Sequence, residues 1–310
     1  MTASKSVIYK SSNARIVEPY PLTRTLLVKP KDSGKMLVSF LTERFSFVSA
    51  EEWIRRIEKK WVWFDDGAAG PDSILKSNQL IYHHTPTVKE PSVPDDVGIV
   101  KESENWLIVF KPAPMPMHQG GRYYKNTLTY ILEREGYTNL SLVHRLDSVT
   151  SGLVLFARNK ETAGRFQLAF SSLNVEKWYY ALVKGTLSEM ITVTAPIRRK
   201  KGFIFECGDN LAGAKPAETI IEPEQTDGDM SIVKCKLVTG RTHQIRLHLR
   251  EAGLPILNDP IYGPNGDSSG KQLQNRSIFL QSSALKIAEY GISEEIGIPD
   301  DWLERIKNGS

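Results

Sequence analysis

Short apolar runs of strand length dominate the sequence after residue 98, and helical periodicity is rare between them. The runs are rich in β-branched and aromatic residues, which favours strands over buried helix segments. They lie at residues 106–110, 152–157, 179–183, 203–205, 230–237 and 278–280. Two helices are predicted among them, one capped by Asn159 and one running from about Arg241 to Glu251. Strands with few helices between them predict an α+β domain with a mixed, mostly antiparallel sheet.

A proline-rich stretch separates this strand-rich region from a smaller N-terminal one. Residues 85–97 have the sequence TPTVKEPSVPDDV, with three prolines and no helical periodicity, which indicates an extended connection. A chain of 310 residues is long enough for a catalytic domain and a small additional one. We therefore predict an N-terminal region over residues 1–85, a linker over 86–97 and a larger domain over 98–310.

The N-terminal region has two helical patterns followed by two strand patterns. Apolar residues have helical spacing in Met36–Phe45, and Ser49 can cap a second helix. Trp61–Phe64 and Leu80–Tyr82 are strand-like. This order resembles the S4-like RNA-binding module, a small α/β fold. Where the S4 pattern usually has Gly, Asn, Gly and Gly, the residues here are Lys60, Asp65, Asp66 and Asn78. The alternative is a helical cap that only packs on the larger domain.

Charge and composition weakly favour an anionic partner. The chain has 40 Lys and Arg residues against 36 Asp and Glu, a net charge of +4. Arg122–Lys125 combines two basic residues with two tyrosines. Such mixtures suit RNA phosphates and bases, although they are also common on solvated surfaces. No run approaches the roughly 18 apolar residues of a membrane helix, and no signal-like segment is present. With two cysteines outside any CxxC spacing, we expect a cytoplasmic protein with reduced thiols.

Two polar segments carry the residues from which chemistry is expected. The first, Leu142–Gly152, has the sequence LVHRLDSVTSG, and its single acid, Asp147, precedes an apolar strand. We expect this carboxylate to be largely desolvated, which is unfavourable unless it is paired. The second, Thr239–His248, has the sequence TGRTHQIRLH and places Arg241 at the predicted start of a helix. We predict that Arg241 pairs with Asp147 and keeps it ionised.

These segments resemble the signature motifs of the RluA-type pseudouridine synthases. HRLDxxTSG occurs at residues 144–152, KxYxAxVxG at 177–185, and TGRTHQIRLHL at 239–249. Residues 111–118 match the first family motif, except that Pro114 replaces the usual Gly. Further pieces are similar to the subgroup that contains eukaryotic tRNA- and mRNA-modifying members, so the resemblance covers nearly the whole chain. It implies the pseudouridine synthase fold, with a central cleft in the sheet.

The resemblance also implies a reaction and the residues that perform it. The N-glycosidic bond of a uridine in RNA is broken, the uracil is turned, and C5 is joined to C1′, so no cofactor or metal is expected. Asp147 is the implied catalytic carboxylate, and attack on C1′, attack on C6 and proton abstraction at C2′ all remain open. Tyr179 is implied to stack on the flipped base and to be a candidate acceptor of the C5 proton, and Arg241 to orient Asp147. The implied substrate- and RNA-binding residues are Arg145, which fills the space left by the extruded nucleotide, and His144, Lys177, Ile245, His118 and Arg122.

Two other functions compete with this one. A protein with the same fold could bind RNA as a chaperone without turnover. A glycosidase-like hydrolase would need a second carboxylate beside Asp147, and no acid in the motifs obviously supplies it. The expected partner is RNA, with tRNA favoured over ribosomal RNA. Because no heptads or self-pairing segments occur, we expect a monomer.

Overall fold

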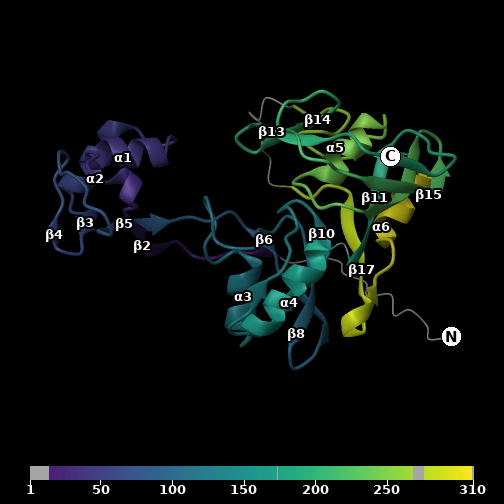
Figure 1. Ribbon diagram of the computed structural model, residues 1–310, viewed down its shortest axis with the longest axis horizontal. Coiled ribbons are helices and arrows are strands. Elements are labelled where there is room, and N and C mark those ends of the chain that lie inside the picture. The colour runs from purple at the N-terminus through teal and green to yellow at the C-terminus, as the bar shows by residue number, and fades with distance from the viewer. Residues whose placement is uncertain (1–13, 173, 268–275, 309–310) are drawn as a thin grey trace. The chain divides into compact units, whose positions relative to one another are not determined.

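A ten-stranded mixed sheet forms the frame of the larger of two compact units in the computed structural model, which describes residues 14–172, 174–267 and 276–308. The strand order is β12-β15-β16-β11-β17-β10-β8-β7, with β18 beside β17 and β9 beside β10. Figure 1 labels β8, β10, β11, β15 and β17 of this sheet. Every pairing in this sheet is antiparallel except that of β10 with β17. The strands are β7 (Gly98–Glu102), β8 (Trp106–Lys111), β9 (Ser141–Leu142), β10 (Ser151–Ala157), β11 (Glu176–Lys184), β12 (Ile191–Val193), β15 (Thr219–Asp227), β16 (Met230–Leu237), β17 (Leu280–Ile287) and β18 (Ile292–Glu295).

Helices cover both faces of this sheet, which explains the apolar runs in β8 and β10. On one face, Val154 and Phe156 of β10 pack in a core with residues of α3 and α5. On the other, Leu153 and Leu155 pack against α4, while α6 covers β11 and β16. These helices are α3 (Leu128–Arg134), α4 (Lys160–Ser171), α5 (Gln244–Glu251) and α6 (Asp300–Asn308). Asn159 caps α4 as predicted, since its Oδ1 accepts a hydrogen bond from the backbone N–H of Thr162.

Two smaller pairs of strands complete this unit. β13 (Ile197–Lys201) and β14 (Ile204–Cys207) form a hairpin, and Ile197 packs in a small core with Leu247 of α5. β1 (Ala14–Arg15) pairs with β6 (Val93–Pro94). Part of the predicted linker is therefore a strand. Pro94 is compatible with this pairing because it stands at the end of a two-residue edge strand. The 3-10 helix η2 (Ala288–Tyr290) joins β17 to β18.

Gly152 allows the close approach of β10 to β17. Its φ is +113°, and an added Cβ would lie 2.2 Å from the carbonyl oxygen of Ser282. We therefore expect Gly152→Ala to lower the free energy of unfolding by about 2–3 kcal/mol, through strain and overpacking. Gly164→Ala is the matched control in helix α4, where nothing lies within 4 Å, and it should raise stability by up to about 1 kcal/mol. Urea titrations measure both, and equal effects at the two sites would contradict this account.

The smaller unit, Val17–Glu90, is a four-stranded antiparallel sheet with two helices on one face. Trp53 and Ile57 of α2 pack with Leu37 and Leu41 of α1 against β3 and β5. Ser49 caps α2 as predicted, accepting a hydrogen bond from the N–H of Glu52. The elements are β2 (Tyr20–Leu27), η1 (Pro30–Asp32), α1 (Leu37–Arg44), α2 (Ala50–Glu58), β3 (Val62–Phe64), β4 (Gly67–Ala68) and β5 (Leu80–Val88). In the described part of the chain, every helix is too short or too polar to span a membrane.

Candidate active site

Asp147 lies in the loop that leads from β9 into β10. The backbone N–H of Thr150 donates to its carbonyl oxygen at 3.1 Å, and the N–H of Met115 donates to the carbonyl of Ser148 at 2.8 Å. These bonds fix the loop against the segment that follows β8. The side chain of Asp147 is 29% exposed, so its carboxylate is less desolvated than the sequence predicted and can be reached from solvent. Accessibility of this kind is what a reacting carboxylate needs.

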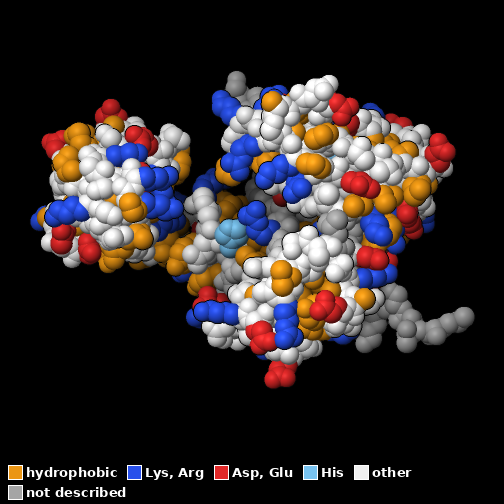
Figure 2. Space-filling view, in the orientation of Figure 1, with side chains coloured by type: hydrophobic (Ala, Val, Ile, Leu, Met, Phe, Trp, Pro, Cys, Tyr) orange, Lys and Arg blue, Asp and Glu red, His pale blue; other side chains and the backbone are white. Residues whose placement is uncertain are grey.

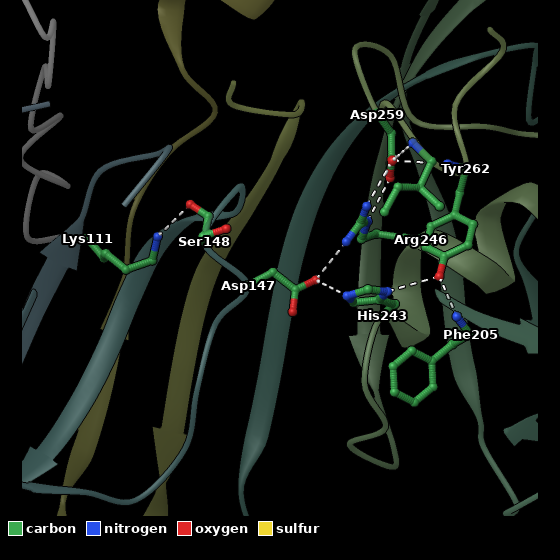
Figure 3. A network of polar contacts seen from close by, with 9 residues as sticks. Lys111, Asp147, Ser148, Phe205, His243, Arg246, Asp259 and Tyr262 are labelled. Carbon is green, nitrogen blue, oxygen red and sulfur yellow. Dashed lines mark hydrogen bonds and ion pairs between the residues drawn. The ribbon is translucent and has the colours of Figure 1, made fainter. Parts of the chain in front are cut away.

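Arg246 of α5 is the arginine that pairs with Asp147. Its Nη1 donates to Oδ2 of Asp147 at 3.1 Å, while Nε and Nη2 donate to the two oxygens of Asp259 at 2.7 and 2.9 Å (Figure 3). The backbone N–H groups of Ile261 and Tyr262 also donate to Asp259. Burial opposes the charge on both partners. The interactions with Asp259 and Asp147 nevertheless raise the pKa of Arg246, and those with Arg246 lower the pKa of Asp259.

The prediction that Arg241 pairs with Asp147 is wrong. Arg241 is exposed, and its Nε donates to the carbonyl of Pro216 at 2.9 Å. The reason is the start of the helix, because α5 begins at Gln244 rather than at Arg241. The side chain of Gln244 accepts hydrogen bonds from the N–H of Arg241 and from the hydroxyl of Thr239, and so folds the preceding residues into a turn. Arg246 then faces the site from within the first turns of the helix.

His243 also contacts Asp147, and it was not predicted as a site residue. Its Nε2 lies 3.7 Å from Oδ2 of Asp147, and its Nδ1 lies 3.0 Å from the hydroxyl of Tyr262. That hydroxyl accepts a hydrogen bond from the backbone N–H of Phe205 in β14 at 2.9 Å. Burial lowers the pKa of His243; the charge of Asp147 raises it and that of Arg246 lowers it. The chain of contacts thus links the hairpin of β13 and β14 to the carboxylate (Figure 3).

Lys111, at the end of β8, is fully buried beneath the Asp147 loop. Its Nζ donates to the carbonyl oxygens of Pro112 at 3.0 Å, Met115 at 2.9 Å and Ser148 at 3.3 Å. An ammonium group has three donors, so each carbonyl is matched by one proton. Burial lowers the pKa of Lys111 to about 7, against the effect of Asp147, which raises it. Lys111 therefore ties the loop that carries Asp147 to the end of β8.

Replacing Lys111 by Met is expected to lower the free energy of unfolding by about 2–4 kcal/mol, because three carbonyl groups lose their donor. The effect should depend on pH. The unfolded chain, with a lysine pKa near 10.5, binds this proton more tightly than the folded protein. Folding therefore releases a proton between pH 7 and 10.5, and the stability difference between wild type and Lys111→Met should grow with pH across that window. Denaturant titrations at several pH values measure it. The exposed Lys184→Met is the control, and a flat difference would contradict the burial argument.

Tyr179, Ile245 and His144 are predicted site residues that the structure places in packed surroundings. Tyr179 in β11 is 6% exposed, and burial raises the pKa of its phenol, with Ser282 opposing and Asp147 adding to the rise. Ile245 packs in the same core. The Nε2 of His144 accepts a hydrogen bond from the N–H of Leu155, and burial lowers the pKa of His144 to about 3. His144 is therefore neutral.

The predicted basic contacts differ in exposure. Lys177 is half-buried, with its Nζ 5.5 Å from the ring centre of Phe170, and burial lowers its pKa. Arg145, His118 and Arg122 are exposed. Among the described residues, no group of three or more His, Cys, Asp or Glu side chains is placed to hold a metal ion. The side chains that the structure brings to Asp147 are thus Arg246 and His243, with Lys111 beneath its loop.

Some of the missed residues left a signal in the sequence. Arg246 has the apolar neighbours Ile245 and Leu247, and a charged residue between apolar ones is a candidate for a buried pair. Lys111 follows directly on the apolar run of β8 in the same way. For His243 no such signal exists, because its contact depends on a left-handed backbone conformation with φ of 57°.

Several known proteins are similar to this chain. A family described as RNA pseudouridylate synthase matches residues 105–251. RNA pseudouridine synthase 7 of Oryza sativa subsp. japonica is 36% identical over 256 residues, which cover 80% of this chain and 65% of the rice protein. The tRNA pseudouridine(31) synthase of Saccharomyces cerevisiae is 31% identical over 297 residues, covering 82% of this chain and 73% of the yeast protein. The solved structure of human RNA pseudouridylate synthase domain containing 1 has a TM-score of 0.56 and 28% identity, covering 68% of this chain and 86% of that one.

Proposed function

The chain belongs to the RNA pseudouridylate synthase family, and on that premise we propose that it isomerises uridines in RNA to pseudouridine with Asp147 as the catalytic carboxylate. One observation carries the assignment to Asp147. It is an accessible carboxylate whose negative charge is held by a buried arginine, in the loop that leads into a central strand. Because the chain spans 65% of the length of the rice relative, its substrate and partners are part of the proposal.

The residue types suit the reaction. Breaking the N-glycosidic bond and joining C5 of the same uracil to C1′ leaves the atoms unchanged, so the carboxylate only has to attack or take a proton and then leave. Tyr179 is our proposed contact of the uracil ring. Since burial raises its pKa, a phenolate at neutral pH is disfavoured, and we favour stacking on the base over proton abstraction. Arg246 takes over the role that the sequence assigned to Arg241.

Exposed basic side chains support RNA as the partner. Lys and Arg side chains gather on one side of the larger unit (Figure 2). In the hairpin of β13 and β14, Arg199 lies over the ring of Phe205, and Phe203 at the turn is 78% exposed. We propose Arg145, His118 and Arg122 as further RNA contacts, because cations bind phosphates and aromatic rings stack on bases. The name of the yeast relative makes tRNA the first substrate to test.

We also propose that the smaller unit is an S4-like module. Its two helices precede β3, β4 and β5 in the order that the resemblance requires, although β2 comes before them. The cytoplasmic location and the monomeric state stay predictions, and gel filtration of the purified chain tests the second.

The function is tested by incubating the purified full chain with RNA that carries tritium at C5 of uridine. Pseudouridine formation replaces the hydrogen at C5, so tritium is released to water. We expect release from tRNA transcripts and compare it with release from ribosomal RNA fragments. Binding to both RNAs without release would favour the competing function, a binding protein that has lost turnover.

A further inference from the structure

The proton positions around His243 can be worked out from the contacts of Tyr262. The Tyr262 hydroxyl accepts the N–H of Phe205, so its own proton is free to be donated. In the described part of the chain, the acceptor within reach of that proton is Nδ1 of His243, at 3.0 Å. A histidine whose Nδ1 accepts a hydrogen bond carries its single proton on Nε2 when it is neutral. That nitrogen is the one that faces Asp147.

The backbone holds the imidazole ring in this place. His243 has φ 57° and ψ 20°, in the left-handed region that only a few per cent of residues other than Gly adopt, His among the more frequent of them. Such strained positions persist where the surroundings fix them, and they cluster at functional sites. Here the ring packs edge-on to Phe205 at 5.3 Å and to Tyr262 at 5.5 Å between ring centres. Rings on two sides leave Nε2 directed at the carboxylate.

We propose that His243 is a positioning residue for Asp147, an inference that rests on the proposed function. Tyr262 holds His243 as the Nε2–H tautomer. His243 and Arg246 then both contact Oδ2 of Asp147, and Oδ1 is left to react. Both contacts of the Asp147 carboxylate are made by Oδ2, and Oδ1 points away from them (Figure 3). The 3.7 Å separation from Nε2 is slightly longer than a hydrogen bond, and catalytic contacts often tighten only in the complex with substrate. Two donors on one oxygen fix the plane of the carboxylate and aim the other oxygen.

A neutral His243 suits this role better than a charged one. The titratable and charged groups that face it are Asp147, Arg246, Asp259 and Tyr262. Burial and Arg246 oppose a positive charge on the ring, whereas the two carboxylates, already shared with Arg246, favour it. An imidazolium would also need to donate from Nδ1 and would leave the Tyr262 hydroxyl proton without that acceptor. The neutral donor therefore orients Asp147 without competing for the negative charge that the reaction uses.

The tautomer can be read directly, without RNA, from the nitrogen NMR signals of histidine-labelled protein. We expect His243, identified by the signal that His243→Gln removes, to carry its proton on Nε2. In Tyr262→Phe the donor to Nδ1 is gone, and both tautomers should appear. The same variant should lower kcat about 10-fold with KM nearly unchanged, because Asp147 is less well oriented. A proton on Nδ1 in the wild type would overturn the proposal.

A matched pair of substitutions tests the donor itself. His243→Phe keeps an aromatic ring but has no N–H, and we expect kcat to fall roughly 100-fold. In His243→Gln the residue has to adopt the same left-handed backbone conformation, but its side-chain amide offers an N–H near the position of Nε2. We expect its kcat to be about 10-fold higher than that of His243→Phe. If the two variants were equally slow, the donor role would be refuted. A wild type that releases no tritium from any RNA would instead refute the proposed function, and an active Asp147→Asn would refute the role of Asp147; the tautomer result would stand in both cases.

Discussion

Asp147→Asn is expected to abolish pseudouridine formation, with kcat lowered by roughly 10⁴-fold or more. The substitution keeps the size of the side chain but removes its negative charge, so the amide can neither attack nor accept a proton as the carboxylate does. Folding should hardly change, because Arg246 keeps its two hydrogen bonds to Asp259. Tritium release from C5-labelled tRNA measures the activity, and circular dichroism checks the fold.

The control for this experiment is Asp229→Asn, in the same unit. Asp229 is an exposed acid whose contact with Lys184 is 4.0 Å, so its charge should not matter for turnover. We expect this variant to match the wild type. If Asp147→Asn kept more than about a tenth of the wild-type kcat, the carboxylate would not be the reacting group.

Arg246→Met is expected to lower the free energy of unfolding by about 3–5 kcal/mol, the largest effect on stability that the site predicts. The side chain of Asp259 is 0% exposed, and without Arg246 its charge would stay buried with only two backbone N–H donors. Activity should fall as well, since Asp147 loses the charged donor to Oδ2 and keeps only the contact with His243. Denaturant titration gives the stability, and Arg246→Met combined with Asp259→Asn should recover part of the loss.

Arg241→Met is the matched control, and it also tests the correction of the sequence prediction. Arg241 is exposed and donates only to the carbonyl of Pro216 through its side chain, so its removal should cost less than about 1 kcal/mol. A larger cost for Arg241→Met than for Arg246→Met would mean that the two arginines have exchanged roles. Arg246→Lys should fall in between, because lysine keeps the charge but not the paired N–H groups that fit Asp259.

The central strands could be predicted from the sequence, but the edge strands could not. β8 and β10 are covered on both faces, so most of their residues are apolar and the runs stand out, while β16 mixes apolar residues with Ser231, Lys234 and Lys236. β2 alternates between half-buried and exposed residues, and β15 contains Pro223 and several acids, so neither has the apolar run that marks a strand. The apolar run at 278–280 indicated β17, but that strand extends from Leu280 to Ile287.

Within the site, the segments that contribute residues were easier to predict than the contacts those residues make. Asp147 was predicted from its motif, and Arg241 of the TGRTHQIR segment was predicted as its partner. Which arginine of this segment faces Asp147 depends on where the helix begins. The helix begins at Gln244, three residues later than predicted, and three residues correspond to most of one helical turn. The position of His243 depends on a single left-handed residue, and that of Lys111 on three carbonyl groups from two loops. Such tertiary features leave no periodic pattern.

The guanidinium of Arg246 is hydrogen-bonded to two carboxylates, those of Asp259 and Asp147, so the three side chains together have an overall charge of −1. Asp259 takes two of the three hydrogen bonds and both supporting backbone donors, so the unbalanced charge falls on Asp147. Electron density at the reacting oxygen is thereby preserved. The same surplus repels the phosphates of an approaching polynucleotide, and exposed cations such as Arg145 and Arg122 are what can offset that repulsion.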